Sequence, residues 1–365
     1  MAPWQRGVVG NPSGGHRAAR EARRAIEEAR DEVAAFVGAE PGEVIFTAGG
    51  TESCHLAIAG VASHHRRHHE STTIVVSRVE HHAVLDAAAK AAFDYPTVKV
   101  RLVDVDADGV VDLDSLHDAL APDVAVVSVM TANNEVGVRQ PLDGVSSIVK
   151  SLPGGAVVHT DAVAAAPWLY LPAVTAAVDM VSICAHKIGG PVSSGALIVR
   201  NDVALDAVVP GGGQERGRRG GTVDVAAAVG LAAAARATMR DLDVVTERVI
   251  DYQDRLTAAL GFLPGAVVTA SSALRLPGTV HVTFAGLASD ELLFLLDQAG
   301  VCASAAASCS SGAAEPSHVL AAMGIDADRA RGSLRLSMGG ETTEDEVDAL
   351  IAILTQVVYS LRAEV

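Results

Sequence analysis

At 365 residues the chain is long enough for two domains and a large core, and its net charge of −16 at pH 7 argues against general nucleic-acid binding. No apolar stretch approaches the length of a membrane-spanning helix and no signal-peptide pattern opens the chain, so we expect no membrane association and a cytoplasmic location. The four cysteines are widely scattered without metal-ligand spacing, so we expect reduced thiols and no bound metal.

The first part of the chain contains a candidate phosphate-binding turn. Residues 1–15 are rich in Gly and Pro, and the helical spacing at 16–37 predicts an amphipathic helix. A short strand at 43–46 then runs into Thr-Ala-Gly-Gly-Thr-Glu at 47–52, before a predicted helix at 53–62. Free N–H groups, the positive end of a helix dipole and a hydroxyl meet at such a turn, which suits a phosphate. An ordinary βα turn explains this stretch equally well.

Strands and helices alternate from residue 72 onward, which predicts a largely parallel sheet with helices on both faces. We expect strands at 74–76, 98–103, 124–130, 157–158 and 178–183, a helix at 83–92, and a short helix capped by Asp114. In such sheets, ligands bind at the carboxyl ends of the strands. The polar residues that follow strand ends are therefore candidate ligand contacts: Thr51, His81, Asn134, Asp161 and Lys187.

Lys187 has unusual neighbours for a lysine. It follows an apolar, β-branched run that predicts a buried strand, and Gly189, Gly190 and Pro191 predict a tight turn after it. Lysine rarely lies among apolar segments without a partner. A desolvated amine that bonds covalently to a carbonyl compound is one reason for this placement. A lysine whose charged end reaches solvent from a strand end is the alternative.

The last third of the chain predicts a smaller α+β domain that begins near residue 235. Before it, a Gly- and Arg-rich loop at 210–222 suits the close approach of an anion or a second subunit. Cys309 lies in a run of small residues, whereas Cys54 and Cys302 fit the pattern of buried structural cysteines. The other elements expected are helices at 225–260, 289–299 and 343–361, the last with a capping box, and strands at 280–284 and 334–337.

Nine short motifs follow one another along the chain: GNPSGGH, FTAGGTES, VEHHAVLD, ANNEVG, HTDAV, AHKIGGP, GGGQERGRRGGT, CSSGAAEPSHVL and LRLSMG. In this order they resemble the class V aminotransferase group of pyridoxal 5'-phosphate (PLP) enzymes, and best the cysteine desulfurases of the NifS/IscS type. The resemblance implies an α/β fold, fold type I of the PLP-dependent transferases. This fold has a mostly parallel sheet of the seven-stranded type that is flanked by helices, and it also has a smaller α+β domain. The implied parts are an N-terminal segment at 1–15, a large PLP-binding domain at 16–235 and a small domain at 236–365.

The resemblance also implies a role for each residue at the strand ends. Lys187 would hold PLP covalently and then abstract the substrate Cα proton. His81 would stack on the pyridine ring, and Asp161 would pair with the ring nitrogen so that the ring acts as an electron sink. The remaining cofactor contacts implied are Asn134 to the ring oxygen, Gly50, Thr51, Cys184 and His186 near the phosphate, and Thr222 to the phosphate of the neighbouring subunit of a homodimer.

For the substrate, the resemblance implies that Arg335 binds the carboxylate of L-cysteine as a bidentate pair and that Asn11 contacts the substrate. The Cys309 thiolate would attack the substrate sulfur, which leaves a persulfide on Cys309 and releases L-alanine. A protein sulfur acceptor, either an iron–sulfur cluster scaffold or a thiolation protein, would then take the sulfur.

The chain departs from the family pattern at several positions. The opening strand with its Asp-x-x-Ala-Thr-Thr-Pro pattern is not found, Ala164 stands in place of a Gln beside the ring oxygen, and Cys184 stands in place of a Ser. Two alternatives to a cysteine desulfurase therefore remain. One is another class V PLP enzyme, such as a selenocysteine lyase, a related lyase or an aminotransferase. The other is a non-catalytic homologue that acts as a partner protein.

Overall fold

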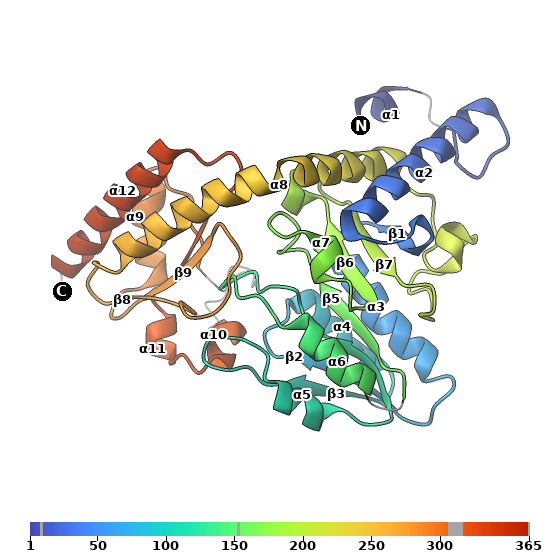
Figure 1. The fold of residues 1–365 in the computed structure, drawn as a ribbon, viewed down its shortest axis with the longest axis horizontal. Coiled ribbons are helices and arrows are strands. Elements are labelled where there is room, and N and C mark those ends of the chain that lie inside the picture. Colours follow the sequence, from blue (N-terminus) through green and yellow to red (C-terminus); the bar gives the residue numbers. More distant parts are fainter. Residues whose placement is uncertain (8–9, 152–153, 306–316, 364–365) are drawn as a thin grey trace. The chain divides into compact units, whose positions relative to one another are not determined.

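A computed structural model describes residues 1–7, 10–151, 154–305 and 317–363, which divide into two units (Figure 1). The large unit comprises Met1–Val103, Val111–Thr131 and Gln140–Leu242. The small unit comprises Asp104–Val110, Ala132–Arg139 and Asp243–Val365. Helix α8 (Val225–Leu260) contributes to both units, and the boundary expected at 235/236 falls inside it.

The large unit is built on a mostly parallel sheet. In the described part of the chain its seven strands are β1 (Val44–Thr47), β2 (Thr72–Ser77), β3 (Val98–Val103), β4 (Val124–Ser128), β5 (Val157–Asp161), β6 (Met180–Cys184) and β7 (Gly195–Val199). Their order is β1-β7-β6-β5-β4-β2-β3, and only β7 runs against its neighbours. The predicted fold class is therefore confirmed, and the carboxyl ends of β1, β2, β4, β5 and β6 lie at one edge.

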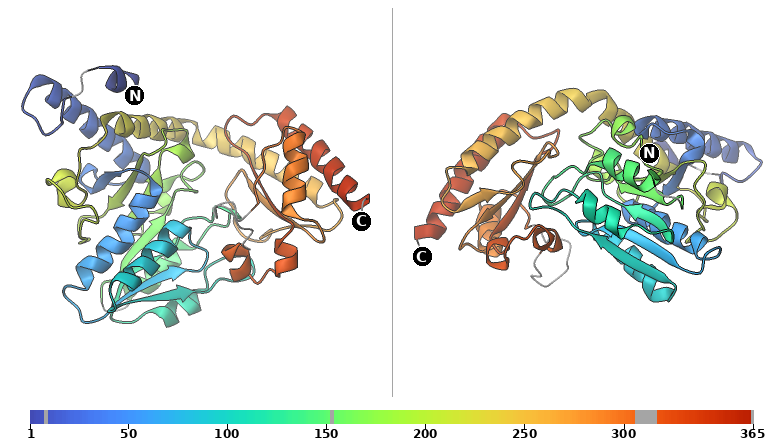
Figure 2. Two further views of the ribbon diagram at one scale, coloured as in Figure 1. Left: turned by 180° about the vertical axis from the view of Figure 1, so that it is seen from behind. Right: turned by 60° about the horizontal axis from the view of Figure 1, so that its bottom comes forward.

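The large unit contains the following helices besides part of α8, and Figure 2 shows the fold from two further sides. They are α1 (Ala2–Arg6), α2 (Arg17–Val37), α3 (Gly50–His65), α4 (His82–Asp94), α5 (Leu113–Ala119), α6 (Leu142–Ser151) and α7 (Leu171–Val174), with short 3-10 turns η1 (Pro41–Glu43), η2 (His186–Ile188) and η3 (Gln214–Gly217). The cap expected at Asp114 is wrong. Asp112 caps α5, because its carboxylate accepts the N–H groups of Asp114 and Ser115.

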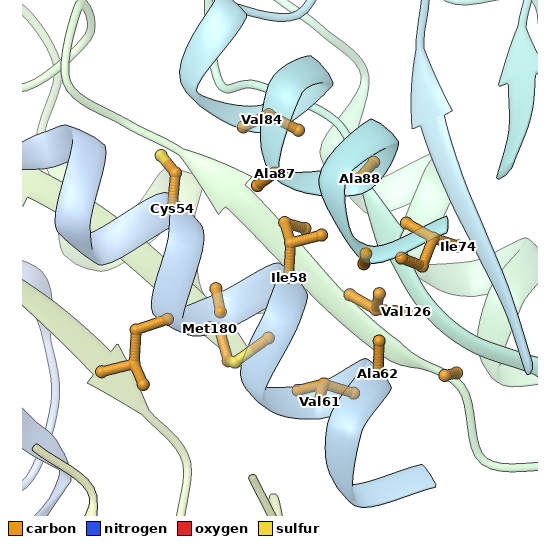
Figure 3. Close-up of a cluster of buried hydrophobic side chains, with 14 of the residues drawn as sticks. Cys54, Ile58, Val61, Ala62, Ile74, Val84, Ala87, Ala88, Val126 and Met180 are labelled. Carbon is orange, nitrogen blue, oxygen red and sulfur yellow. The ribbon is translucent and has the colours of Figure 1, made fainter. Parts of the chain in front are cut away.

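The core of the large unit forms where α3 and α4 pack on the sheet (Figure 3). The buried side chains labelled there are Cys54, Ile58, Val61 and Ala62 of α3, Val84, Ala87 and Ala88 of α4, and Ile74, Val126 and Met180 of the strands. Burial of each larger aliphatic side chain contributes about 1.5–3 kcal/mol, and the small alanines let the helices approach closely. This packing holds the first turn of α3 against the sheet edge.

The small unit has an antiparallel sheet. Among the described residues its strands are β8 (Ala266–Val268), β9 (Thr279–Phe284) and β10 (Ser333–Ser337), in the order β10-β9-β8. Its helices are α9 (Ser289–Gln298), α10 (His318–Ala322), α11 (Ala327–Ala330) and α12 (Glu344–Ala363). The predicted capping box before α12 is present, because Thr343 and Glu346 accept each other's backbone N–H groups. Over the described ranges, every helix is too short or too polar to cross a membrane.

Candidate active site

The turn between β1 and α3 borders a hollow of about 530 Å³ in the large unit. Gly49 adopts φ 146°, a conformation that residues with a side chain rarely adopt, and α3 begins at the next residue. A Cβ added to Gly50 would lie 2.9 Å from Val163 Cγ2, so this close approach requires glycine. Thr51 and His186 line the same hollow. A helix N-terminus, a hydroxyl and an imidazole therefore meet beside one open space, as an anion site requires.

A carboxylate in this hollow is neutralised by the Gly- and Arg-rich loop. Glu52 Oε1 accepts a hydrogen bond from Arg219 Nε at 2.8 Å, and Glu52 Oε2 accepts one from the N–H of Ala48 at 2.6 Å. Although burial acts to raise it, these partners bring the pKa of Glu52 below its usual range. The hollow therefore contains an ion pair, not a free negative charge that would repel a phosphate.

Lys187 lies on η2, just past the end of β6. Because the strand ends at Cys184, the turn carries Lys187 to an exposed position, not into the apolar surroundings expected from its flanking runs. Cys184 Sγ lies 3.8 Å from His186 Nε2. Burial raises the pKa of Cys184 to about 11, and burial followed by the charge of Lys187 lowers the pKa of His186. The Cys184 thiol and the His186 ring are consequently both neutral at pH 7.

Asp161, the last residue of β5, is a buried carboxylate. Its Oδ1 accepts the N–H of Val163 at 2.9 Å, and its Oδ2 lies 3.7 Å from the thiol of Cys54. Burial raises the pKa of Asp161, although these hydrogen bonds and the nearby His81 and Lys187 act in the opposite direction. A positively charged partner at this place would therefore be stabilised.

His81 is the N-cap of α4 and has a defined tautomer. Its Nδ1 accepts the N–H of Ala83 at 3.0 Å, which leaves the proton of the neutral ring on Nε2. Glu80, the residue before it, is fully buried, and its Oε1 accepts the N–H of Met130 at 2.5 Å. Burial and then the charge of Asp161 raise the pKa of Glu80 to about 8. At pH 7 Glu80 is therefore mostly protonated.

Two predicted site residues of the large unit lie away from the hollow beside Thr51. Asn11 is exposed, and its Oδ1 accepts the N–H of Ser13 at 3.0 Å. Thr222 is also exposed, and it lines a separate hollow of about 290 Å³ together with Arg30 and Glu215. The structure of the single chain thus brings Thr51, His186, Lys187, His81 and Asp161 to one sheet edge, without Asn11 and Thr222.

The small unit contains the predicted residues Arg335 and Asn134. Arg335 lies on β10, and its Nη1 donates to the backbone oxygen of Asn134 at 3.1 Å. Its Nε is buried and has no hydrogen-bond partner among the described residues, so this guanidinium can still accommodate an acceptor. Burial raises the pKa of Glu135 to about 7, against the effects of a hydrogen bond from Ser317 and the charge of Arg335.

A family model for class-V aminotransferases matches residues 3–350. The chain belongs to the class-V aminotransferase family. An IscS-like cysteine desulfurase of Mycobacterium tuberculosis is 43% identical over 367 residues, which cover 99% of this chain and 92% of that protein. A solved NifS-like protein is 34% identical with a TM-score of 0.87, over 97% of this chain and 92% of that one. SspA, solved in complex with cysteine, is 29% identical with a TM-score of 0.76, over 93% and 94% of the two chains.

Members of this family of the NifS/IscS type depend on PLP, so the predicted cofactor is confirmed. The residues of the large unit fit this cofactor. Asp161 is a buried carboxylate suited to a protonated ring nitrogen, the turn at Gly50 and Thr51 suits a phosphate, and Lys187 supplies an exposed amine. PLP, when bound, supplies a conjugated ring that takes up negative charge from the substrate Cα.

The cysteines separate into different environments. Cys309 lies outside the described residues. Cys302 is exposed, so its predicted burial is wrong. It lies in the loop between α9 and Ser304, and the backbone of Ser304 pairs with that of Arg335. Cys54 is buried as predicted, but its contact with Asp161 was not anticipated. The available signal was its position two residues after the predicted phosphate-binding turn at 47–52.

Proposed function

We propose that the chain converts L-cysteine to L-alanine and holds the released sulfur as a persulfide on Cys309. The observation that carries this proposal is the grouping of Lys187, His81 and Asp161 at the carboxyl edge of the sheet. The 43% identity to a cysteine desulfurase supports the reaction, and the cysteine bound by SspA supports L-cysteine as the substrate.

The sulfur transfer balances without another reactant. The Cys309 thiolate attacks the substrate sulfur, so that an S–S bond forms as the Cβ–S bond of the substrate breaks. The electron pair of the broken bond goes to the substrate carbon, which then takes up a proton. One L-cysteine and one enzyme thiol therefore give one L-alanine and one enzyme persulfide.

The proposed roles of the other residues follow from their surroundings. The exposed amine of Lys187 holds the cofactor and then removes the substrate Cα proton. His81 stacks on the cofactor ring, and its Nε2–H can donate a proton because Nδ1 accepts the N–H of Ala83. Asp161 keeps the ring nitrogen protonated. Arg335 binds the substrate carboxylate with the part of its guanidinium that Asn134 leaves available, and Asn11 contacts the substrate.

Most of the remaining cofactor contacts are proposed at the hollow beside Thr51. Gly50, Thr51 and His186 bind the phosphate, and the neutral thiol of Cys184 lies near it without repelling it. Asn134 hydrogen-bonds to the ring oxygen. Thr222 lies beside a different hollow of the same chain, which supports a role toward the phosphate of a second subunit in a homodimer.

We also propose a protein sulfur acceptor, either an iron–sulfur cluster scaffold or a thiolation protein, in the cytoplasm. The persulfide has to be removed before Cys309 can react again, so turnover requires an acceptor or a reducing thiol.

Alanine release from L-cysteine in the presence of a reducing thiol tests the proposed reaction. The wild type is expected to release alanine, and Cys309→Ser is expected to lose about 99% or more of this activity because it lacks the attacking thiolate. Cys302→Ser, which changes an exposed cysteine, serves as the matched control and should retain it. Alanine release that survives in Cys309→Ser would show that another residue takes the sulfur. A wild type that shows no protein-bound absorption band after the excess PLP is removed would favour the non-catalytic alternative.

A further inference from the structure

A chain of buried polar side chains ends at Asp161, and the proposed reaction uses none of its other members. It comprises Ser128, His159, Ser182, Cys54 and Asp161, and we call it the buried polar chain. The first four of these residues have no exposed surface, and Asp161 is 6% exposed. They come from β4, β5, β6 and α3, four elements that pack together in the core of the large unit. Figure 3 shows Cys54 on α3, at one end of the hydrophobic cluster.

Hydrogen bonds connect every member to the next. Ser128 Oγ lies 2.8 Å from His159 Nδ1, and His159 Nε2 lies 2.9 Å from Ser182 Oγ. Ser182 also acts on Cys54 by a side-chain hydrogen bond, which works to lower the pKa of the thiol. Cys54 Sγ in turn lies 3.7 Å from Asp161 Oδ2. Buried polar groups in such a continuous chain polarise one another, so the arrangement of one member constrains the next.

The number of available protons determines the direction of these bonds. The Cys54 thiol donates its single S–H proton to Asp161 Oδ2. The sulfur must then accept the hydroxyl proton of Ser182. With that proton used, Ser182 Oγ can only accept from His159, which places the ring proton of His159 on Nε2.

The last bond of the chain follows from the charge of His159. Burial lowers the pKa of His159 to about 3, so its ring is neutral and carries one proton. Since that proton is on Nε2, the bare Nδ1 accepts the hydroxyl proton of Ser128. In each of the four hydrogen bonds, the donor therefore lies on the side away from Asp161. If Asp161 were protonated, the four bonds could run in the opposite direction.

We propose that the buried polar chain is a positioning device that fixes the orientation and the ionised state of Asp161, with Cys54 as its final donor and His159 held as the Nε2–H tautomer. The proposal rests on the proposed function, in which Asp161 pairs with the ring nitrogen of PLP. The N–H of Val163 holds Oδ1, and the Cys54 thiol holds Oδ2. The two contacts together fix the plane of the carboxylate.

The ring nitrogens of His159 give a direct readout of this direction. Nitrogen-15 NMR distinguishes a protonated from a bare ring nitrogen, and His159→Gln identifies the signals of His159 among the 13 histidines. In the PLP-loaded wild type, we expect Nε2 protonated and Nδ1 bare. An Nδ1–H tautomer, or an even mixture of the two, would overturn the proposal.

Substitution of Cys54 tests the final donor. Cys54→Ser keeps a proton donor at this position, and Cys54→Ala removes it. We expect Cys54→Ala to mix the two tautomers of His159 and to speed PLP dissociation by about 2- to 10-fold, the loss of one hydrogen bond. Cys54→Ser should keep the Nε2–H tautomer of His159, and its rate of PLP dissociation should lie within about 2-fold of the wild-type rate. Cys302→Ser should change neither quantity, because Cys302 is exposed.

The S–H stretching band of Cys54 adds a readout that does not need PLP. In infrared difference spectra between the wild type and Cys54→Ala, we expect the band of a donating thiol, shifted from that of a free thiol. An unshifted band, or Cys54→Ala equal to the wild type in both tautomer and PLP dissociation, would overturn the proposal. Failure of the wild type to bind PLP would instead contradict the proposed function, while the band and the tautomer still test the buried polar chain.

Discussion

Arg30 and Glu215 form a buried bidentate ion pair, although they lie 185 positions apart in the sequence. Arg30 Nη2 lies 2.8 Å from Glu215 Oε1, and Arg30 Nη1 lies 3.0 Å from Glu215 Oε2. Glu215 Oε2 also accepts the N–H of Phe46 at 2.8 Å. Glu215 itself adopts φ 45°, in the left-handed region that favours glycine. The pair thus anchors the Gly- and Arg-rich loop, which carries Thr222, to α2 and β1.

Removal of one partner of this pair should destabilise the large unit strongly. We expect Glu215→Ala to lower the free energy of unfolding by about 3–5 kcal/mol, because Arg30 is left as an unpaired buried charge. Urea unfolding followed by circular dichroism measures this change. The exposed pair of Arg24 and Glu28 offers the control, and Arg24→Met should change the free energy of unfolding little, because solvent screens this pair. Equal costs for the two variants would contradict the anchoring role of Glu215.

Glu80 should make stability depend on pH. Its pKa in the folded chain is about 8 and its ordinary value is 4.5, because burial and then Asp161 disfavour the charged form. For a carboxyl with a raised pKa, the stability contribution is fully present below pH 4.5 and is lost as the pH rises through 8. Glu80→Gln removes this ionisation and keeps an oxygen for the N–H of Met130.

We therefore expect Glu80→Gln to be more stable than the wild type by on the order of 2–4 kcal/mol at pH 8, and by much less at pH 4. Urea unfolding at both pH values tests this difference. Glu70→Gln, at an exposed glutamate, is the control. Its stability relative to the wild type should be nearly the same at both pH values. A difference between Glu80→Gln and the wild type that is the same at both pH values would refute the assignment of a neutral Glu80.

Arg219 should assist phosphate binding by neutralising Glu52. We expect Arg219→Met to weaken PLP binding by about 5- to 10-fold, because the carboxylate of Glu52 is then unpaired beside the phosphate site. The double variant Arg219→Met/Glu52→Gln should regain most of this affinity, since the repelling charge is gone. Titration of the PLP-free protein with PLP measures the PLP affinity of both variants. No recovery in the double variant would mean that Arg219 contacts the cofactor by itself.

The sequence predicted the sheet and the strand-end residues well because both depend on local patterns. An apolar β-branched run before His186 and Lys187 is sufficient to place a strand and its end. Side-chain environment was harder to predict, because it depends on residues far away in the chain. The polar partner of Cys54 is Asp161, 107 positions later, and the exposure of Cys302 depends on how Ser304 pairs with Arg335.

The position of the sulfur after one reaction tests the central claim most directly. The wild type, loaded with PLP, is incubated with one equivalent of L-cysteine, alkylated, digested and examined by mass spectrometry. The account predicts one extra sulfur atom on the peptide that contains Cys309, in amounts equal to the alanine formed. Alanine without an extra sulfur on that peptide, or extra sulfur on the peptides of Cys54, Cys184 or Cys302 instead, would contradict it.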